Sequence, residues 1–481
     1  MELHVEQQQI PCFLPTAKHR LEEPFHADCV VPDALPDAGA LLLAEGDLCL
    51  WRLDIEQGGA TIEGEVSVRV CYLPEEGGAP VSLPLSVPVL LRVRGEDIVP
   101  GLRPFDRCRI TDLQAQLIHS RKLRVQGRAR CDFVGYAPGE LSLTVGLGEG
   151  ERGIFTRKTP CAVQVVSAVE EQVFTAAETI PLRLGAPSDG QLLSHTSVPV
   201  LSETQLLDGR VILQGRVVTE LLYLDPRRGE LVSETVETPF SQLMEPGGDL
   251  PIEQVRATLH LTSESVRCRA DEAAVETELH LVAQIVCVSG VQTDCVTDAY
   301  SVRGALTPEW EEVPFTATAP GEEQRLFLEG MIPCETAGAA VCVSRAALRC
   351  ERAAVTVLLR DGEGRLSART GELPVELPEG AQAIPEPLSV TPGAEGLSLR
   401  LPVRVETVQT ETRTLRQISC AVLEETEEPE DRPGVTLVRR AGTTDLWETA
   451  KAHGSCEAAI RAANPETEGP RRWMIVPAVR G

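Results

Sequence analysis

The residue types that carry out catalysis are present in this sequence, but their spacing fits no catalytic motif. There is no G-x-x-x-x-G-K-[ST] phosphate loop, no H-E-x-x-H zinc motif and no G-x-S-x-G nucleophile turn. The glycine-rich run at 146–150 follows a strand-like segment, but it leads into acids and Gly153 instead of a helix whose free amides could hold a phosphate. We therefore predict a protein that is not an enzyme, with no catalytic residue and no cofactor.

The histidines and cysteines do not form a metal-binding pattern. His260 and His280 fall on neighbouring predicted strands, but neither has a cysteine or carboxylate at ligand spacing. The 15 cysteines are scattered, odd in number and without a C-x-x-C pair. Several lie among Val and Leu, where a thiol behaves as a small apolar group. The sequence predicts no metal site and mostly buried, reduced thiols.

Composition excludes several classes of function. The chain has 481 residues, a formal charge of −27, 42% hydrophobic residues and 24% charged residues. This length and apolar content predict three or four domains with packed cores. The acidic excess argues against binding to nucleic acid or to anionic lipid, because both need a cationic face. Aromatic residues make up 4% of the chain, which leaves few platforms for stacking nucleotide bases.

The sequence contains no recognisable targeting or membrane segment. Its first residues, MELHVEQQQIPC, have neither the basic nor the apolar part of a secretory signal. No apolar run approaches the roughly 18 residues that cross a bilayer. We expect a protein made and kept in the cytosol, with no signal peptide and no transmembrane segment.

Most of the chain has the pattern of short β-strands separated by Gly, Pro and Asp turns. Residues 66–72 alternate apolar or β-branched residues with polar ones, as in a half-buried strand. The segments 121–131, 211–224, 275–288 and 397–405 follow the same pattern. Helical periodicity is scarce before residue 440. The fold class predicted is mainly β, with antiparallel sandwich-like domains.

The strand pattern is repeated along the chain. Gly64 precedes Tyr72 by eight residues, and Gly215 precedes Tyr223 by the same interval, 151 positions later. A third copy at 353–361 has lost both residues. We predict three tandem β domains, with each tyrosine ring in a core and its hydroxyl at the rim. Their expected bounds are 1–165 with an N-terminal extension, 166–312, and a divergent copy at 313–423.

The C-terminal region differs from the rest in charge and pattern. Residues 424–433 are rich in acids and proline, which predicts an extended linker. Residues 434–481 read as strand, helix, helix, strand, with Thr444 and Ser455 as expected helix caps and Gly454 ending the first helix. The expected core of this small α+β domain is Leu446, Trp447, Ala450, Ile460 and Ile475.

This tail resembles a LysM domain. The resemblance runs through residues 446–451, Gly454, 462–464 and 475–477. It implies a βααβ fold, which in the family commonly binds N-acetylglucosamine-containing glycans. The chain departs from the family with one extra residue before Leu446 and with an arginine pair before the last strand. The implied binding surface is Gly442, Thr443, Thr444, Asn464, Arg471 and Arg472.

The N-terminal region resembles the SPOCS domain, through residues 30–37 and the strand from Gly64 to Leu73. SPOCS-type repeats, an acidic linker and a C-terminal LysM together resemble the SipL- and SpoVID-like spore-coat morphogenetic proteins. This resemblance implies a scaffold in the mother-cell cytoplasm, at the forespore surface. It would dock through its LysM domain onto the SpoIVA-type ATPase of the coat basement layer and contact other coat proteins. The first alternative is a protein that binds peptidoglycan in the cell wall or spore cortex. The second is a wall-active enzyme anchored by its LysM domain, for which no catalytic residues are recognisable in the sequence.

Overall fold

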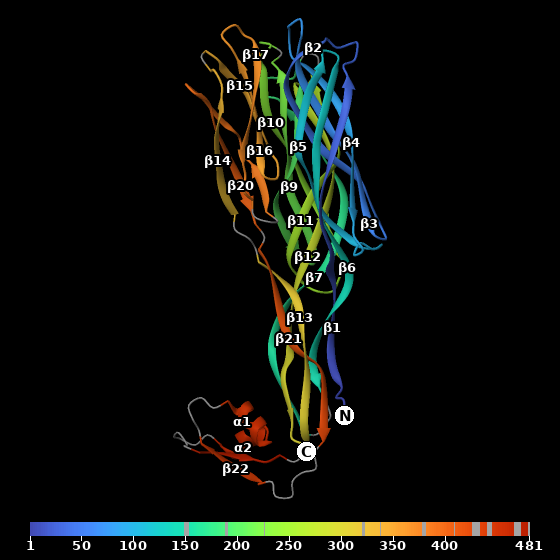
Figure 1. Ribbon diagram of the computed structural model, residues 1–481, viewed down its shortest axis with the longest axis vertical. Coiled ribbons are helices and arrows are strands. Elements are labelled where there is room, and N and C mark those ends of the chain that lie inside the picture. The colour runs from blue at the N-terminus through green and yellow to red at the C-terminus, as the bar shows by residue number, and fades with distance from the viewer. Residues whose placement is uncertain are drawn as a thin grey trace.

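The molecule is elongated and built almost wholly of β-strands (Figure 1). The computed structural model describes residues 1–148, 153–187, 191–225, 227–319, 323–336, 338–377, 381–407, 409–425, 433–439, 445–465 and 473–479. A broad body of packed sheets narrows into a stalk of long strands, and two short helices lie at the far end of the stalk (Figure 1). The mainly β character predicted from the sequence is confirmed.

The first six strands form one body, here called unit 1 (residues 5–147). They are β1 (Val5–Val30), β2 (Ala38–Glu56), β3 (Gly59–Pro74), β4 (Val81–Arg94), β5 (Arg103–His119) and β6 (Lys122–Leu147). One layer has the order β2-β3-β4, and the other has β1-β6-β5. Buried residues alternate with half-buried ones along β3, so that Val66, Val68 and Val70 share a core with Val125 of β6. The two layers therefore enclose one apolar interior.

The next six strands, unit 2 (residues 154–301), pair in the same order. They are β7 (Ile154–Pro181), β8 (Ser194–Leu207), β9 (Arg210–Leu224), β10 (Leu231–Met244), β11 (Ile252–Arg269) and β12 (Ala274–Ser301). One layer is β8-β9-β10, and in the other β12 pairs with both β7 and β11. Since β7 begins at Ile154, the expected boundary at 165/166 falls inside a strand.

Unit 3 (residues 304–425) has the same pairing order, but the strands of one of its two layers are interrupted. Its strands are β13 (Gly304–Ala319), β14 (Glu323–Pro333), β15 (Ala340–Leu348), β16 (Arg352–Arg360), β17 (Leu366–Pro374), β18 (Gln382–Pro385), β19 (Ser389–Gly393), β20 (Gly396–Glu406) and β21 (Gln409–Glu425). One layer is β15-β16-β17, while β20 pairs with β14, β18 and β19, and β13 pairs with β21. The expected boundary at 312/313 falls inside β13.

The repeated glycines stand where two backbones approach closely. Gly64 pairs with Leu50, and Gly215 pairs with Leu201, each next to a β-bulge in the partner strand. A Cβ atom added to Gly64 would lie 2.3 Å from the carbonyl oxygen of Cys49, and one added to Gly215 would lie 2.3 Å from that of Val200. The glycine repeat therefore marks an equivalent bulge in units 1 and 2.

The repeated tyrosines lie in the cores. Tyr72 and Tyr223 are both fully buried. The Tyr72 hydroxyl donates to the carbonyl of Pro36 at 2.9 Å, and the Tyr223 hydroxyl donates to the carboxylate of Glu234 at 2.8 Å. Each hydroxyl thus has a partner at the edge of its core, as a buried tyrosine requires.

The three units meet at a common apolar cluster. Cys71 of β3, Leu222 of β9 and Leu358 of β16 are each 1% exposed or less and belong to one cluster. The residue that follows each of them lies instead in the separate core of its own unit. Side chains alternate along a strand. In each three-stranded layer, one face of the middle strand therefore packs in its unit's core, and the other face packs in the junction between the units.

An ionic network also joins the three units. Arg345 of β15 contacts Glu220 of β9 at 2.5 Å and Glu45 of β2 at 3.7 Å, and donates to the carbonyl of Leu221 at 2.7 Å. Arg345 is 5% exposed, so its guanidinium is shielded from solvent, whereas the side chain of Glu220 is 40% exposed. A buried charge depends on its partners, and Arg345 therefore favours one arrangement of the three units.

The stalk is made of three antiparallel ribbons, one from each unit. The ribbons are the ends of β1 with β6, β7 with β12, and β13 with β21. They share an apolar interior whose buried members are Leu3, Leu147, Val296, Ala299, Ile418, Ala421 and Leu423. The side chain of Gln417, fully buried, donates to the carbonyl of Ser142 and accepts from the N–H of Thr144. The stalk is therefore a packed structure in which all three units take part.

Candidate functional site

The last described elements form a small body at the end of the stalk, here called the terminal unit (residues 433–479). It consists of β22 (Val435–Arg439), α1 (Leu446–His453), α2 (Glu457–Ala463) and β23 (Trp473–Pro477). β22 and β23 pair antiparallel, and the two helices lie between them in the chain.

The helix ends differ from those expected. The side chain of Asp445 caps α1 by accepting from the N–H of Trp447 at 2.9 Å, whereas Thr444, the expected cap, lies outside the described residues. Cys456, and not Ser455, caps α2. The Ser455 hydroxyl instead donates to the carbonyl of Pro477 at 2.6 Å, and so ties the helical turn to β23. Gly454 ends α1 with a left-handed backbone, at φ 59°.

The core of the terminal unit contains most of the residues expected there. Trp447, Ala450 and Ile460 are buried in one cluster, and Leu446 is half-buried against it. Ile475 is half-buried and lies outside the cluster. The inward positions of β23 belong to Met474 and Val476, because side chains alternate along the strand.

The stalk completes this core. Tyr300 and Val302, from the end of β12 and the turn after it, are buried in the same cluster as Trp447, and Phe155 of β7 packs against it. The rings of Tyr300 and Trp447 lie 4.8 Å apart at an angle of 72°, an edge-on contact. The Tyr300 hydroxyl donates to the carbonyl of Ser455 at 2.8 Å. The terminal unit is therefore packed onto the β7–β12 ribbon.

Polar contacts fix the orientation of the terminal unit. Asp298 of β12 accepts from the indole N–H of Trp447 at 2.8 Å and from Lys451 at 2.8 Å. Arg157 of β7 contacts Asp445 at 3.2 Å. Burial tends to raise the pKa of Asp298, but the hydrogen bonds from Lys451 and Trp447 outweigh it, and the pKa lies below its ordinary value. Asp298 is therefore held as a carboxylate at neutral pH.

The binding residues expected from the resemblance are only partly described. Gly442, Thr443, Thr444, Arg471 and Arg472 lie outside the described residues. Asn464 ends α2, and its amide group donates to the carbonyl of Ile475 at 2.6 Å and accepts from the N–H of Ile475 at 2.8 Å. Its side chain thus links α2 to β23, and a role in binding stays a prediction.

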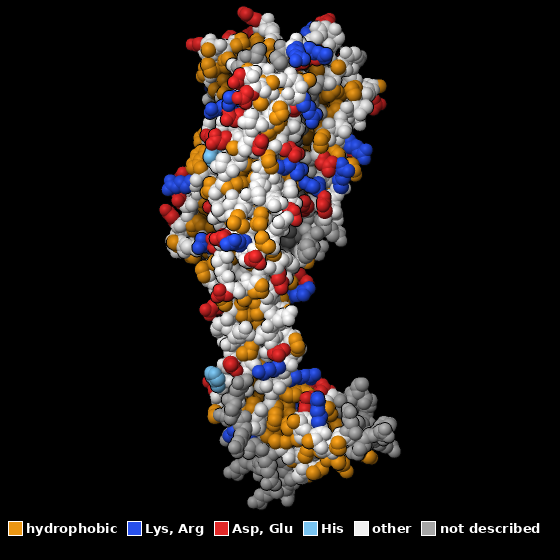
Figure 2. Space-filling view, turned by 180° about the vertical axis from the view of Figure 1, so that it is seen from behind, with side chains coloured by type: hydrophobic (Ala, Val, Ile, Leu, Met, Phe, Trp, Pro, Cys, Tyr) orange, Lys and Arg blue, Asp and Glu red, His pale blue; other side chains and the backbone are white. Residues whose placement is uncertain are grey.

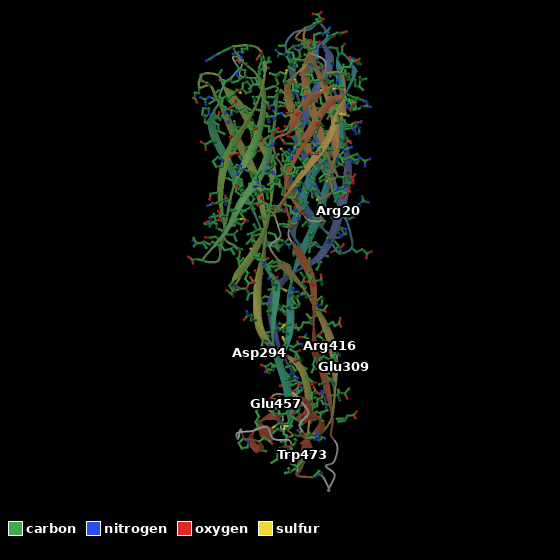
Figure 3. The ribbon with its side chains drawn as sticks, turned by 90° about the vertical axis from the view of Figure 1, so that its left-hand side faces the viewer. Arg20, Asp294, Glu309, Arg416, Glu457 and Trp473 are labelled. Carbon is green, nitrogen blue, oxygen red and sulfur yellow. The ribbon has the colours of Figure 1, made fainter. Side chains whose placement is uncertain are left out.

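An exposed apolar face lies on the outer side of the β22–β23 pair. Val435, Leu437 and Trp473 are 57%, 63% and 53% exposed. Leu437 pairs with Ile475, and Arg439 pairs with Trp473, so these side chains are direct neighbours across the two strands. Hydrophobic side chains gather on the surface at this end of the molecule in Figure 2, and Figure 3 labels Trp473 there. We call Val435, Leu437, Arg439, Trp473, Ile475 and Pro477 the outer face.

The outer face was not predicted from the sequence. The alternation that places these residues was present in the sequence. Val435, Leu437 and Arg439 share one side of a strand, and its other side packs toward the core of the terminal unit. Both sides carry apolar residues, so periodicity alone could not tell the buried side from the exposed one.

Two groups of potential metal ligands occur among the described residues, although no sequence motif predicted them. One consists of Asp106, Cys108 and Cys131, and the other of Asp47, His195 and Glu264. Burial lowers the pKa of His195 to about 3, so its ring is neutral at physiological pH.

His260 and His280, which fall on neighbouring predicted strands, engage different groups. The ring of His260 contacts the carbonyl of Asp106 at 2.8 Å, and the ring of His280 contacts the hydroxyl of Thr175 at 3.0 Å.

No family model, curated protein or solved structure matches this chain. Among the described residues, no helix is long and apolar enough to cross a membrane.

Proposed function

We propose that this chain is a non-enzymatic scaffold of the SipL- and SpoVID-like class, which assembles the spore coat at the forespore surface from the mother-cell cytoplasm. The outer face carries this proposal: it is an exposed apolar surface on a small unit held away from the body by a packed stalk. Apolar patches rimmed by polar groups are characteristic of protein–protein contact sites.

The partner proposed is the SpoIVA-type ATPase of the coat basement layer, with other coat proteins binding elsewhere. The terminal unit is proposed as a LysM domain, supported by its sequence resemblance and by the order β22, α1, α2, β23. Its net positive sequence charge, +2 over residues 435–481, favours an acidic partner surface and would chiefly speed the encounter.

We also infer that units 1, 2 and 3 are copies of one SPOCS-type domain. Three features support this inference: the shared pairing order, the equivalent bulges at Gly64 and Gly215, and the matching junction positions Cys71, Leu222 and Leu358. A body fixed by a common core and a buried ionic network suits a scaffold, which must hold several partners at set distances.

The proposal is tested with the full-length chain, because residues of the stalk complete the core of the terminal unit. Its affinity for the purified basement-layer ATPase is measured by surface plasmon resonance. In parallel, the chain is sedimented with purified peptidoglycan sacculi, with and without free chito-oligosaccharide. Saturable binding to the ATPase without pelleting supports the scaffold. Pelleting that chito-oligosaccharide abolishes, without ATPase binding, would establish the alternative, a LysM protein that binds peptidoglycan.

A further inference from the structure

A buried group of three metal-ligand side chains joins units 1 and 2. Asp47 lies on β2 of unit 1, His195 on β8 and Glu264 on β11 of unit 2. Their ligand atoms all lie within 4.8 Å of one another. The side chains of His195 and Glu264 are each 4% exposed, and Asp47 is 8% exposed as a residue. Three strands from two units therefore bring two carboxylates and an imidazole together away from solvent.

Several polar atoms at the centre of this group are poorly satisfied. Nδ1 of His195 makes no hydrogen bond, and no N–H or O–H donates with good geometry to the carboxylate oxygens of Glu264, which lie beside the carboxyl of Asp47 and the hydroxyls of Ser197 and Ser67. Nδ1 of His195 and Oε2 of Glu264 are 3.8 Å apart. Asp47 is held in place by the N–H of Ser197, at 2.9 Å from Oδ2. Buried polar atoms almost always have partners, so poorly satisfied atoms that converge on one point suit the binding of a cation.

No basic side chain described near the site donates a hydrogen bond to Glu264. Glu45, which is buried nearby, is engaged by Ser194 and Arg345. Arg69 and Arg349 exert electrostatic effects on Glu264 and Asp47, respectively, but neither donates a hydrogen bond to the oxygens of Glu264. These oxygens and Nδ1 of His195 therefore remain available to a bound ion.

We propose that Asp47, His195 and Glu264 bind a divalent transition-metal ion of the Zn²⁺ type, which fastens unit 1 to unit 2. An imidazole nitrogen with carboxylate oxygens is a ligand set that Zn²⁺ accepts, and two carboxylates balance its charge. A water molecule or a neighbouring hydroxyl, such as that of Ser197, would complete the coordination. This inference does not depend on the proposed scaffold function.

The second ligand group is the weaker candidate. Its Asp106 carboxylate already accepts from the amide of Gln284 at 2.7 Å and from the thiol of Cys108 at 3.4 Å. The Asp106 carboxylate is thus satisfied within the protein, unlike Nδ1 of His195.

The test uses the full-length chain purified without a histidine tag. Elemental mass spectrometry measures its metal content, and thermal unfolding measures its Tm. We expect about one ion per chain, a Tm that falls by several degrees on chelation, and recovery when Zn²⁺ alone is added back. Glu264→Gln should lose the ion and have a lower Tm that no longer responds to the chelator. A parent chain without metal, whose Tm chelation does not change, overturns the proposal whether or not the variant folds.

Two matched variants locate the ion. Glu45→Gln changes a buried acid two residues from Asp47 and should keep the metal. Asp106→Asn should keep it as well. Loss of metal in Asp106→Asn with retention in Glu264→Gln would assign the ion to the second group and refute the proposal. Without a metal, Glu264→Gln would remove a buried acid that lies beside Asp47 and leave the Tm unchanged or higher.

Discussion

The rings of Trp447 and Tyr300 meet edge-on, with centroids 4.8 Å apart, although 147 positions separate them in the chain. This contact joins the core of the terminal unit to the stalk. It fixes the orientation of the terminal unit and therefore of the outer face. Trp447 thus contributes both to the folding of the terminal unit and to its attachment to the stalk.

Replacing Trp447 with Ala should unfold the terminal unit and release it from the stalk. Removing a large buried aromatic ring costs about 3–5 kcal/mol, and this small unit has few other contacts to compensate. Hydrogen exchange of residues 445–465 should lose its protection while units 1 to 3 stay protected. The matched change Tyr300→Phe removes only the hydroxyl bonded to Ser455 and should cost about 1 kcal/mol. Retained protection in Trp447→Ala would contradict this account.

Attachment of the terminal unit should weaken in acid. Because the pKa of Asp298 is lower in the folded protein than its ordinary 3.8, its contribution to stability is complete above pH 3.8 and is lost as pH falls through the lowered value. Hydrogen exchange of residues 445–465, measured between pH 7 and pH 2.5 and corrected for the intrinsic rate, should show this loss. Asp298→Asn should be less stable at pH 7 and lack this component of the pH dependence. An identical pH profile in the two chains would exclude Asp298 as its source.

Trp473→Ser should weaken binding to the proposed partner, the basement-layer ATPase, by about tenfold or more, as expected for an aromatic anchor at an interface. The fold should be retained, because Trp473 is 53% exposed. Trp51, on β2, is also 53% exposed and provides the matched control Trp51→Ser. Surface plasmon resonance compares the two variants with the parent. Equal losses of affinity in both would show that the outer face is not the specific contact.

Leu358→Ala should destabilise the junction of the three units by about 2–5 kcal/mol, because Leu358 is 1% exposed and its removal leaves a cavity between units. Equilibrium unfolding in urea gives the change in free energy. Leu207→Ala, at a position 57% exposed, should change stability by less than about 0.5 kcal/mol. A loss no greater than that of the control would mean that the junction contributes little to stability.

The sequence predicted where strands lie and the spacing of Gly64 and Gly215, but not the lengths of the strands, since 66–72 and 275–288 are parts of the longer strands β3 (Gly59–Pro74) and β12 (Ala274–Ser301). Alternation of apolar and polar residues is a local property that follows from strand geometry, so segments such as 66–72 could be assigned without knowing their neighbours. The Gly64 and Gly215 repeat was visible for the same reason. Its cause, a backbone carbonyl 2.3 Å from where a Cβ would stand, became apparent only in the folded chain.

Tertiary structure decided how these strands are shared between cores. Cys71 and Tyr72 are both buried and adjacent in sequence, yet one lies at the junction and the other in the core of unit 1. The linker and the compact helix pattern predicted a separate terminal domain, but Tyr300 of the stalk completes its core. The convergence of Asp47, His195 and Glu264 had no motif to reveal it, because they come from three strands far apart in the chain. Local patterns specify strands, whereas shape complementarity between distant surfaces determines which strands meet.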